Sequence, residues 1–160
     1  MATQTSFEDI LGNESFDSIE PPKPIPAGQY TCIVKEFRRD RSTKKGTEYV
    51  EYTLGIQGVY KDSVDEDELE DWTEKADGTE RNLQDATLRV TFYLTPNSEY
   101  RWAAFVRHCG VDVPKGASKN QVFPLPVNQE VIATVKHTSE TDPSGEVRIF
   151  ANVTGTAPVK

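Results

Sequence analysis

The stretch from Ala86 to Gly110, ATLRVTFYLTPNSEYRWAAFVRHCG, changes its hydrophobic period part-way and therefore constrains the fold strongly. Its first half alternates in the manner of a half-buried β-strand, whose apolar face consists of Leu88, Val90, Phe92 and Leu94. After Pro96 the spacing becomes helical, and the apolar stripe consists of Trp102, Phe105, Val106 and Cys109. Gly110 is suited to ending this helix. The sequence thus predicts a strand that continues directly into one short helix.

Four further segments have the alternating pattern of strands, at about residues 29–38, 48–57, 130–137 and 147–153. Polar turns that contain glycine separate the first two and the last two, so each pair is expected to form a hairpin. The order is therefore β-β-β-α-β-β, with one helix between strands three and four. Because a small barrel leaves no sheet edge exposed, we predict a mainly β, five-stranded antiparallel barrel of the OB-fold type.

The acidic residues are concentrated at two places outside the predicted strands. Residues 1–28 have a formal charge of −4 and residues 61–80 of −8, whereas residues 29–60 and 81–160 each have +2. We predict an acidic N-terminal arm with a proline-rich lead-in (1–26), one OB-like domain (27–155) with an acidic insertion (61–80), and a loose tail (156–160). The sequence leaves open whether residues 1–20 form a short docking helix or an unfolded arm.

Several classes of protein have no support in the sequence. No apolar run reaches membrane-spanning length and no signal peptide is recognisable, so we expect a soluble cytoplasmic protein. Two buried free thiols are expected, Cys32 and Cys109, and their spacing to His108 and His137 matches no zinc site. Phosphate-binding glycine loops and nucleophile motifs are also missing. We therefore expect no enzyme, no metal and no other cofactor.

Basic residues are dense around the first hairpin turn and predict a nucleic-acid-binding surface. Six of them fall within eleven residues, namely Lys35, Arg38, Arg39, Arg41, Lys44 and Lys45. In OB-folds this turn flanks the binding groove, where bases stack on outward-facing aromatic side chains. The strands supply further outward residues of the required types, namely Phe37, Tyr49, Arg89 and Tyr93. The alternative interpretation is a solubilising turn beside ordinary cross-strand aromatic pairs.

The acidic insertion contains the signals of a short helix. Ser63 and Glu66 have capping-box spacing, and Leu69 and Trp72 would share one side of the helix. One interpretation is a solvated loop, which we favour. A second is a docking peptide, in which Leu69 and Trp72 bind a basic, apolar pocket of a partner. In a third, the insertion lies over the basic groove and competes with DNA.

Four stretches together resemble a known family, namely PPKPIPAGQY, KKGTEYVEYTL, LRVTFYLTP and WAAFVRHCGVD. They are similar to small bacteriophage proteins from replication and recombination regions, some of which are treated as OB-fold single-stranded DNA-binding proteins. The resemblance extends over residues 21–153, with residues 61–80 as an expansion. It implies single-stranded DNA as partner, replication or recombination proteins as further partners, and the host cell cytoplasm as location. These motifs are mainly structural and assign no DNA contact.

Two hypotheses of function follow. The first is binding of single-stranded DNA, with little sequence preference, in phage replication or recombination. The second is a protein-interaction module on the same fold, acting through the acidic insertion or the N-terminal arm. Self-association is compatible with both hypotheses, and the sequence does not decide between DNA and RNA.

Overall fold

The fold is built on one antiparallel sheet of five strands. The computed structural model describes residues 23–74 and 80–159, so the predictions for the N-terminal arm and for residues 75–79 lie outside it. The strands are β1 (Gly28–Arg41), β2 (Glu48–Val59), β3 (Thr87–Tyr93), β4 (Glu130–Thr141) and β5 (Val147–Ala157). They pair in the order β3-β2-β1-β4-β5, and every pair is antiparallel. The prediction of a mainly β protein with five antiparallel strands is confirmed.

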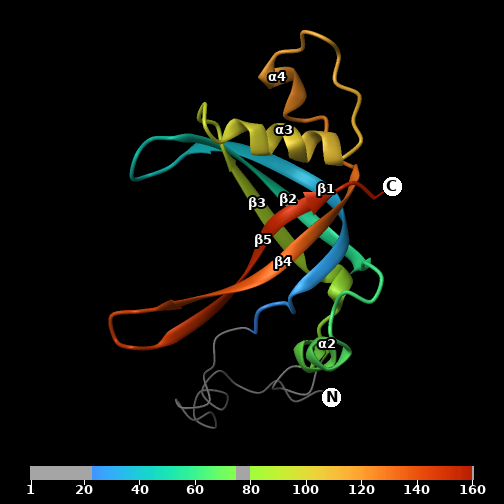
Figure 1. The fold of residues 1–160 in the computed structure, drawn as a ribbon, viewed down its shortest axis with the longest axis vertical. Helices are drawn as coiled ribbons and strands as arrows, with labels where there is room; N and C mark the ends of the chain where they lie inside the picture. Colours follow the sequence, from blue (N-terminus) through green and yellow to red (C-terminus); the bar gives the residue numbers. More distant parts are fainter. Residues whose placement is uncertain (1–22, 75–79, 160) are drawn as a thin grey trace, which may run out of the picture.

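The sheet is curled, so that its two outer strands approach each other (Figure 1). Cα atoms of β3 and β5 come within 8 Å, yet no ladder of hydrogen bonds joins these strands in residues 23–74 and 80–159. The sheet is therefore open between β3 and β5. The predicted barrel is confirmed only as far as a five-stranded antiparallel sheet, and its closure is not.

A β-bulge in β1 changes which side chains point inward. Val34 pairs with Leu54 and Glu36 pairs with Thr53, so Lys35 is an extra residue that has no partner. Such an insertion shifts the alternation by one position. Phe37 consequently lies opposite the buried Tyr52 and packs against the core, whereas the sequence predicted an outward orientation.

Helix α3 (Glu99–His108) covers one end of the sheet, as the helical stripe predicted (Figure 1). Its buried residues are Trp102, Phe105 and Val106, and Gly110 follows with a φ of 71°. The indole N–H of Trp102 donates to the hydroxyl of Tyr52 over 3.0 Å, and this hydroxyl donates to the carbonyl of Phe123 over 2.9 Å. Because both polar atoms are paired, the tyrosine and the indole are buried without leaving a hydrogen bond unmade.

The acidic insertion contains helix α2 (Glu66–Thr73), which lies near the opposite end of the sheet (Figure 1). Asp65 caps this helix, because its carboxylate accepts hydrogen bonds from the amides of Asp67 and Glu68. Ser63 does not form the predicted capping box but bonds the backbone of Gln29. The predicted short helix is therefore confirmed, and because it buries Trp72, residues 66–73 are more than a solvated loop.

Two shorter helical segments complete the described chain, η2 (Leu83–Asp85) and α4 (Lys119–Val122). The first precedes β3 and the second lies in the connection between α3 and β4, so two helices stand between β3 and β4 where the sequence predicted one. Within residues 23–74 and 80–159, none of the helices has the length and apolar character needed to cross a membrane.

Candidate nucleic-acid interface

Two tyrosines lie side by side on the face of β2 and β3 that points away from the core. Tyr49 and Tyr93 are direct cross-strand partners, and their ring centroids are 6.1 Å apart at an angle of 65°. Tyr93 is 48% exposed. Since buried residues alternate with exposed ones along β3, this outward position follows from the pattern that the sequence showed. The pair offers an exposed aromatic surface near the β1–β2 turn.

Arg38 extends this aromatic surface toward β1. Its Nη2 atom lies 3.4 Å from the hydroxyl of Tyr49, and its guanidinium carbon lies 5.9 Å from the centre of that ring. Two carboxylates also approach the guanidinium, those of Glu51 at 3.5 Å and Asp40 at 3.6 Å. Exposed ion pairs of this kind contribute little stability, but they orient the arginine over the tyrosine.

Two more cations lie on the same outer surface. Arg89 is opposite Thr53, and it lines a shallow depression together with Arg38 and Glu51. Lys35, the extra residue of the bulge, extends over Gly55, where any β-carbon would come within 2.3 Å of the Lys35 Cε atom. Gly55 therefore allows the lysine stem to lie flat on β2.

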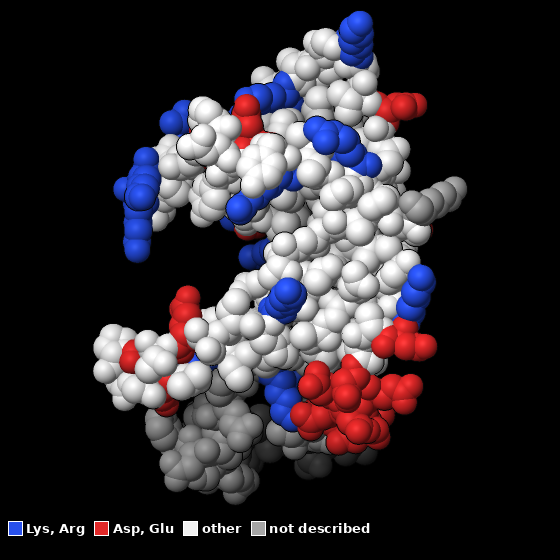
Figure 2. All heavy atoms as spheres, viewed as in Figure 1, with Lys and Arg blue, Asp and Glu red and all other residues white. Residues whose placement is uncertain are grey.

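The β1–β2 turn carries exposed positive charge at the edge of this surface. Figure 2 shows Lys and Arg atoms gathered on the part of the molecule that the β1–β2 hairpin forms at upper left. Arg41 pairs with Glu48 at 3.1 Å. Lys44 and Lys45 are exposed, and neither has an ion-pair partner among the described residues. These two ammonium groups are available to an anionic ligand.

Arg39 does not belong to this surface. It is opposite the buried Val50, and its guanidinium carbon lies 4.4 Å from the centre of the Phe123 ring. Its Nη1 atom donates to the amide oxygen of Asn120 over 2.8 Å. Arg39 thus fixes the connection that contains α4 to the β1–β2 hairpin. Phe37 is also turned inward. Of the ten predicted nucleic-acid contacts, Phe37 and Arg39 therefore lie away from the outer surface.

Acidic residues interrupt the positive charge on the outer surface. Glu36, Asp40 and Glu51 lie among the arginines and lysines of β1 and β2. The surface therefore has a basic tip and a mixed centre, and it has no continuous basic strip. An anionic chain would meet its strongest attraction at the tip, near Lys44 and Lys45.

The β4–β5 hairpin projects on the same side of the molecule as the β1–β2 hairpin, and Figure 2 shows a hollow between them. Its outer part carries exposed Arg148 and Phe150, which alternate with Asn152 along one side of β5. Asn152 and Arg89 both line the opening between β5 and β3, together with Leu88 and Val153. Phe150 was not among the residues predicted from the sequence, although the alternation of residues 148, 150 and 152 was a signal for it.

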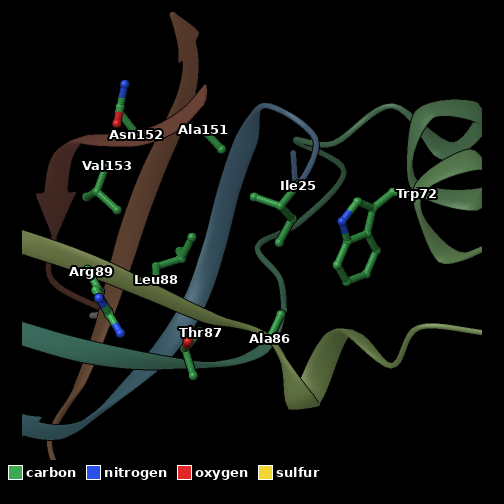
Figure 3. A pocket seen from close by; sticks show the side chains of 9 residues that line it. All are labelled: Ile25, Trp72, Ala86, Thr87, Leu88, Arg89, Ala151, Asn152 and Val153. Atoms are coloured by element: carbon green, nitrogen blue, oxygen red, sulfur yellow. The ribbon is translucent and has the colours of Figure 1, made fainter. Parts of the chain in front are cut away.

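Leu69 and Trp72, the predicted docking residues, are turned toward the body of the protein. Trp72 is 7% exposed, and Leu69 packs against the core from α2. Figure 3 shows Trp72 beside Ile25, with Leu88, Ala151 and Val153 around the same cavity. In this arrangement the indole is not accessible to a partner protein. The outward side of α2 is acidic instead, and it does not lie over the basic turn (Figure 2).

The two cysteines are buried free thiols, and each histidine ring makes a hydrogen bond to another described residue. Burial raises the pKa of the Cys32 and Cys109 thiols to about 12, which keeps both protonated and unreactive near neutral pH. His108 Nδ1 lies 2.8 Å from the hydroxyl of Thr156, and His137 Nε2 donates to the carbonyl of Ile25 over 2.7 Å. In the described part of the chain, no three His, Cys, Asp or Glu side chains are grouped to hold a metal ion.

Comparisons with known proteins add no relative. No model of a known protein family matches the chain, and no curated protein matches it. The resemblance to bacteriophage proteins therefore stays a prediction.

Proposed function

We propose that the protein binds single-stranded DNA with little sequence preference on the outer face of β1, β2 and β3. The observation that carries the proposal is the pair Tyr49 and Tyr93, flanked by Arg38 and Arg89 and bordered by two projecting hairpins. The proposal includes an open OB-fold, because the strand order and the position of α3 after β3 agree with it. In that fold the same face binds single strands.

Each part of the surface has a distinct role in this proposal. Bases stack on the two tyrosines, which contributes about 1–3 kcal/mol per base and tolerates any sequence. Phosphates contact four cations of this surface that form no ion pair with another described residue, namely Lys35, Lys44, Lys45 and Arg89. The carboxylates of Glu51 and Asp40 repel the phosphate chain at the centre of the face. We therefore expect moderate affinity that is strongest near the basic tip.

The salt dependence of binding tests the electrostatic part. If four phosphates are neutralised, the logarithm of the binding constant should fall with the logarithm of salt concentration with a slope of roughly −3. Fluorescence anisotropy of a labelled oligo-dT strand gives this slope directly. The double change Lys44→Glu and Lys45→Glu should reduce the magnitude of the slope, whereas Lys115→Glu, in the exposed loop after α3, serves as the matched control and should leave it unchanged.

The aromatic part is tested by Tyr49→Ala combined with Tyr93→Ala. Loss of two stacking surfaces should weaken binding about a hundredfold, with the circular dichroism spectrum unchanged. Tyr100→Ala is the matched control, because Tyr100 is 62% exposed but belongs to α3. If oligo-dT causes no change in anisotropy at low salt and micromolar protein, the proposal is wrong. Equal losses for the double variant and the control would also exclude the tyrosine surface. These experiments test DNA binding only. The proposed role in phage replication or recombination rests on the resemblance to bacteriophage proteins, which has to be established independently.

A further inference from the structure

Strand β5 forms one edge of the sheet, and within residues 23–74 and 80–159 no strand pairs with the outer part of this edge. The N–H of Asp142 donates to the carbonyl of Glu146 over 2.9 Å, which fixes the pattern of the β4–β5 ladder. Because hydrogen-bonded pairs alternate in an antiparallel ladder, Arg148 and Phe150 direct their backbone groups toward β4. The backbone groups that point outward belong to Val147, Ile149 and Ala151. We call residues 147–151 the free edge, and its row of donors and acceptors can pair with another strand.

The free edge lacks most of the features that protect edge strands from pairing. Its sequence, VRIFA, contains no proline, no glycine and one charged residue. Val147 and Ile149 are 62% and 52% exposed on the face that continues the core side of the sheet, and Phe150 is 43% exposed on the opposite face. The register shift between β4 and β5 lies at Thr134 and Val135, so it does not bend the free edge away. An edge of this composition is expected to pair with another strand.

The free edge is complementary to a second copy of itself in the antiparallel direction. When a two-fold axis passes through Ile149, the two Ile149 side chains are cross-strand partners and Val147 lies opposite Ala151. On the other face, Arg148 lies opposite Phe150, so a cation meets an aromatic ring. An axis through Arg148 would instead place two arginines opposite each other, which is unfavourable.

The position of the hairpin allows pairing around Ile149. Figure 1 shows the β4–β5 hairpin projecting from the body, so two hairpins can lie side by side with their bodies at opposite ends. Ala151 lines the cavity of Figure 3 beside Val153, and Val147 of the second copy would lie next to this cavity. An axis through Phe150 would bring Val147 opposite Val153, where β3 already approaches β5. The register centred on Ile149 avoids this obstruction.

We propose that the protein forms a symmetric dimer in which the free edges of two copies pair antiparallel around Ile149. The two hairpins then form one four-stranded sheet in the order β4-β5-β5-β4, and the exposed side chains of both edges gain apolar cross-strand neighbours. The overlap is five residues long in each copy, so the dimer is weak, with a dissociation constant of about 0.1 mM. This inference does not depend on the binding of DNA, and its test contains no nucleic acid.

Sedimentation velocity of the full-length protein at successive concentrations tests the dimer. Ile149→Pro removes an outward N–H and leaves the ladder to β4 intact, so it should raise the dissociation constant more than about tenfold. Ser139→Pro is the matched control, because Ser139 is the cross-strand partner of Ile149 and its N–H points to the other edge of the hairpin. A protein that stays monomeric at about 1 mM, or equal losses for the two variants, would overturn the proposal. Growth beyond the dimer would also overturn it, because a two-fold pair is closed.

Cysteine cross-linking between copies tests the register. In the proposed dimer the Cα atoms of the two residues 149 are about 5.5 Å apart, which a disulfide can span, whereas those of the two residues 148 are about 8 Å apart. Under mild oxidation, Ile149→Cys should therefore form an intermolecular disulfide about tenfold faster than Arg148→Cys or Phe150→Cys. The native thiols are buried and do not compete. Equal rates at the three positions, or the fastest rate at position 148 or 150, would contradict pairing around Ile149.

Discussion

Helices cover the sheet near both of its ends, and each buries a tryptophan, but the two helices are anchored differently. Helix α3 buries Trp102, Phe105 and Val106, and the indole of Trp102 is hydrogen-bonded to Tyr52 in the centre of the core. Helix α2 buries Trp72 alone. The guanidinium carbon of Arg81 lies 5.8 Å from the centre of the Trp72 ring, and its Nη1 atom donates to the Trp72 carbonyl over 3.1 Å.

The difference follows from what each helix can bury. The sequence of α3 has an apolar stripe of helical period, so the helix adds several side chains to the core. The sequence of α2, EDELEDWT, has two apolar residues among five acids, and the helix adds only the Trp72 side chain to the buried core. We therefore expect α3 to be part of the cooperative fold and α2 to open locally at a lower free energy.

The largest effect is expected for Phe105→Ala at the α3 end. The Phe105 ring is 1% exposed, and its centre lies 4.8 Å from that of Tyr52 and 5.1 Å from that of Phe92. Its removal leaves a cavity among aromatic rings that cannot collapse easily, which should lower the free energy of unfolding by about 3–5 kcal/mol. Urea denaturation followed by circular dichroism measures this. A loss as small as that of an exposed-site control, Tyr100→Ala, would contradict the assignment of α3 to the core.

Trp72→Ala at the other end should have a smaller global effect. The Trp72 side chain is 7% exposed, but α2 buries no other side chain and can open locally, so we expect a loss of about 2 kcal/mol together with exposure of α2. Hydrogen exchange should become faster at residues 66–73 and remain slow at residues 99–108. Equal acceleration in both helices would show that the two ends open as one unit.

The sequence predicted the α3 end better than the α2 end for a physical reason. A period of three to four residues across Trp102, Phe105 and Val106 is a local signal, and it survives in any fold that buries one side of the helix. The burial of Trp72 depends on Ile25, Leu88 and Val153, which are distant in sequence. No local pattern indicated that contact.

In the candidate site, too, the sequence predicted what depends on local alternation and missed what depends on the pairing of strands. The outward positions of Tyr49, Arg89 and Tyr93 follow from strict alternation, and the structure brings these residues together. The positions of Phe37 and Arg39 depend on the bulge at Lys35, because one extra residue exchanges the two faces of a strand. The carboxylates near Arg38 were visible in the sequence, but only the register between β1 and β2 places Glu51 beside the arginine.

Alkaline pH should loosen the α3 end, since two buried acidic groups lie there. Burial raises the pKa of both Cys109 and Tyr52 to about 12, above their ordinary values of 9.0 and 10.0. A raised pKa in the folded state gives stability that is complete below the ordinary value and is lost as the pH rises through the folded value. Stability should therefore fall between about pH 9 and 12, by about 1 kcal/mol per pH unit for each group. Urea titrations at successive pH values measure this, and Cys109→Val should flatten the curve from pH 9 upward. A curve that Cys109→Val leaves unchanged would contradict the raised thiol pKa.

The smallest effect is expected for substitutions of the N-cap residues, because α2 and α3 are capped differently. Asp65 accepts hydrogen bonds from the amides of Asp67 and Glu68 at 2.9 and 3.1 Å, whereas Ser98 makes no side-chain cap to α3. Asp65→Ala should therefore cost about 1 kcal/mol, mainly as faster hydrogen exchange in α2, while Ser98→Ala should have no measurable effect. Asp65→Asn removes the charge that counters the helix dipole but keeps the acceptor oxygen. This variant should therefore retain most of the stability. Since α2 has so few apolar contacts, its cap should account for a larger share of its local stability than any cap could for α3. Equal effects of Asp65→Ala and Ser98→Ala on their helices would remove this distinction between the two ends.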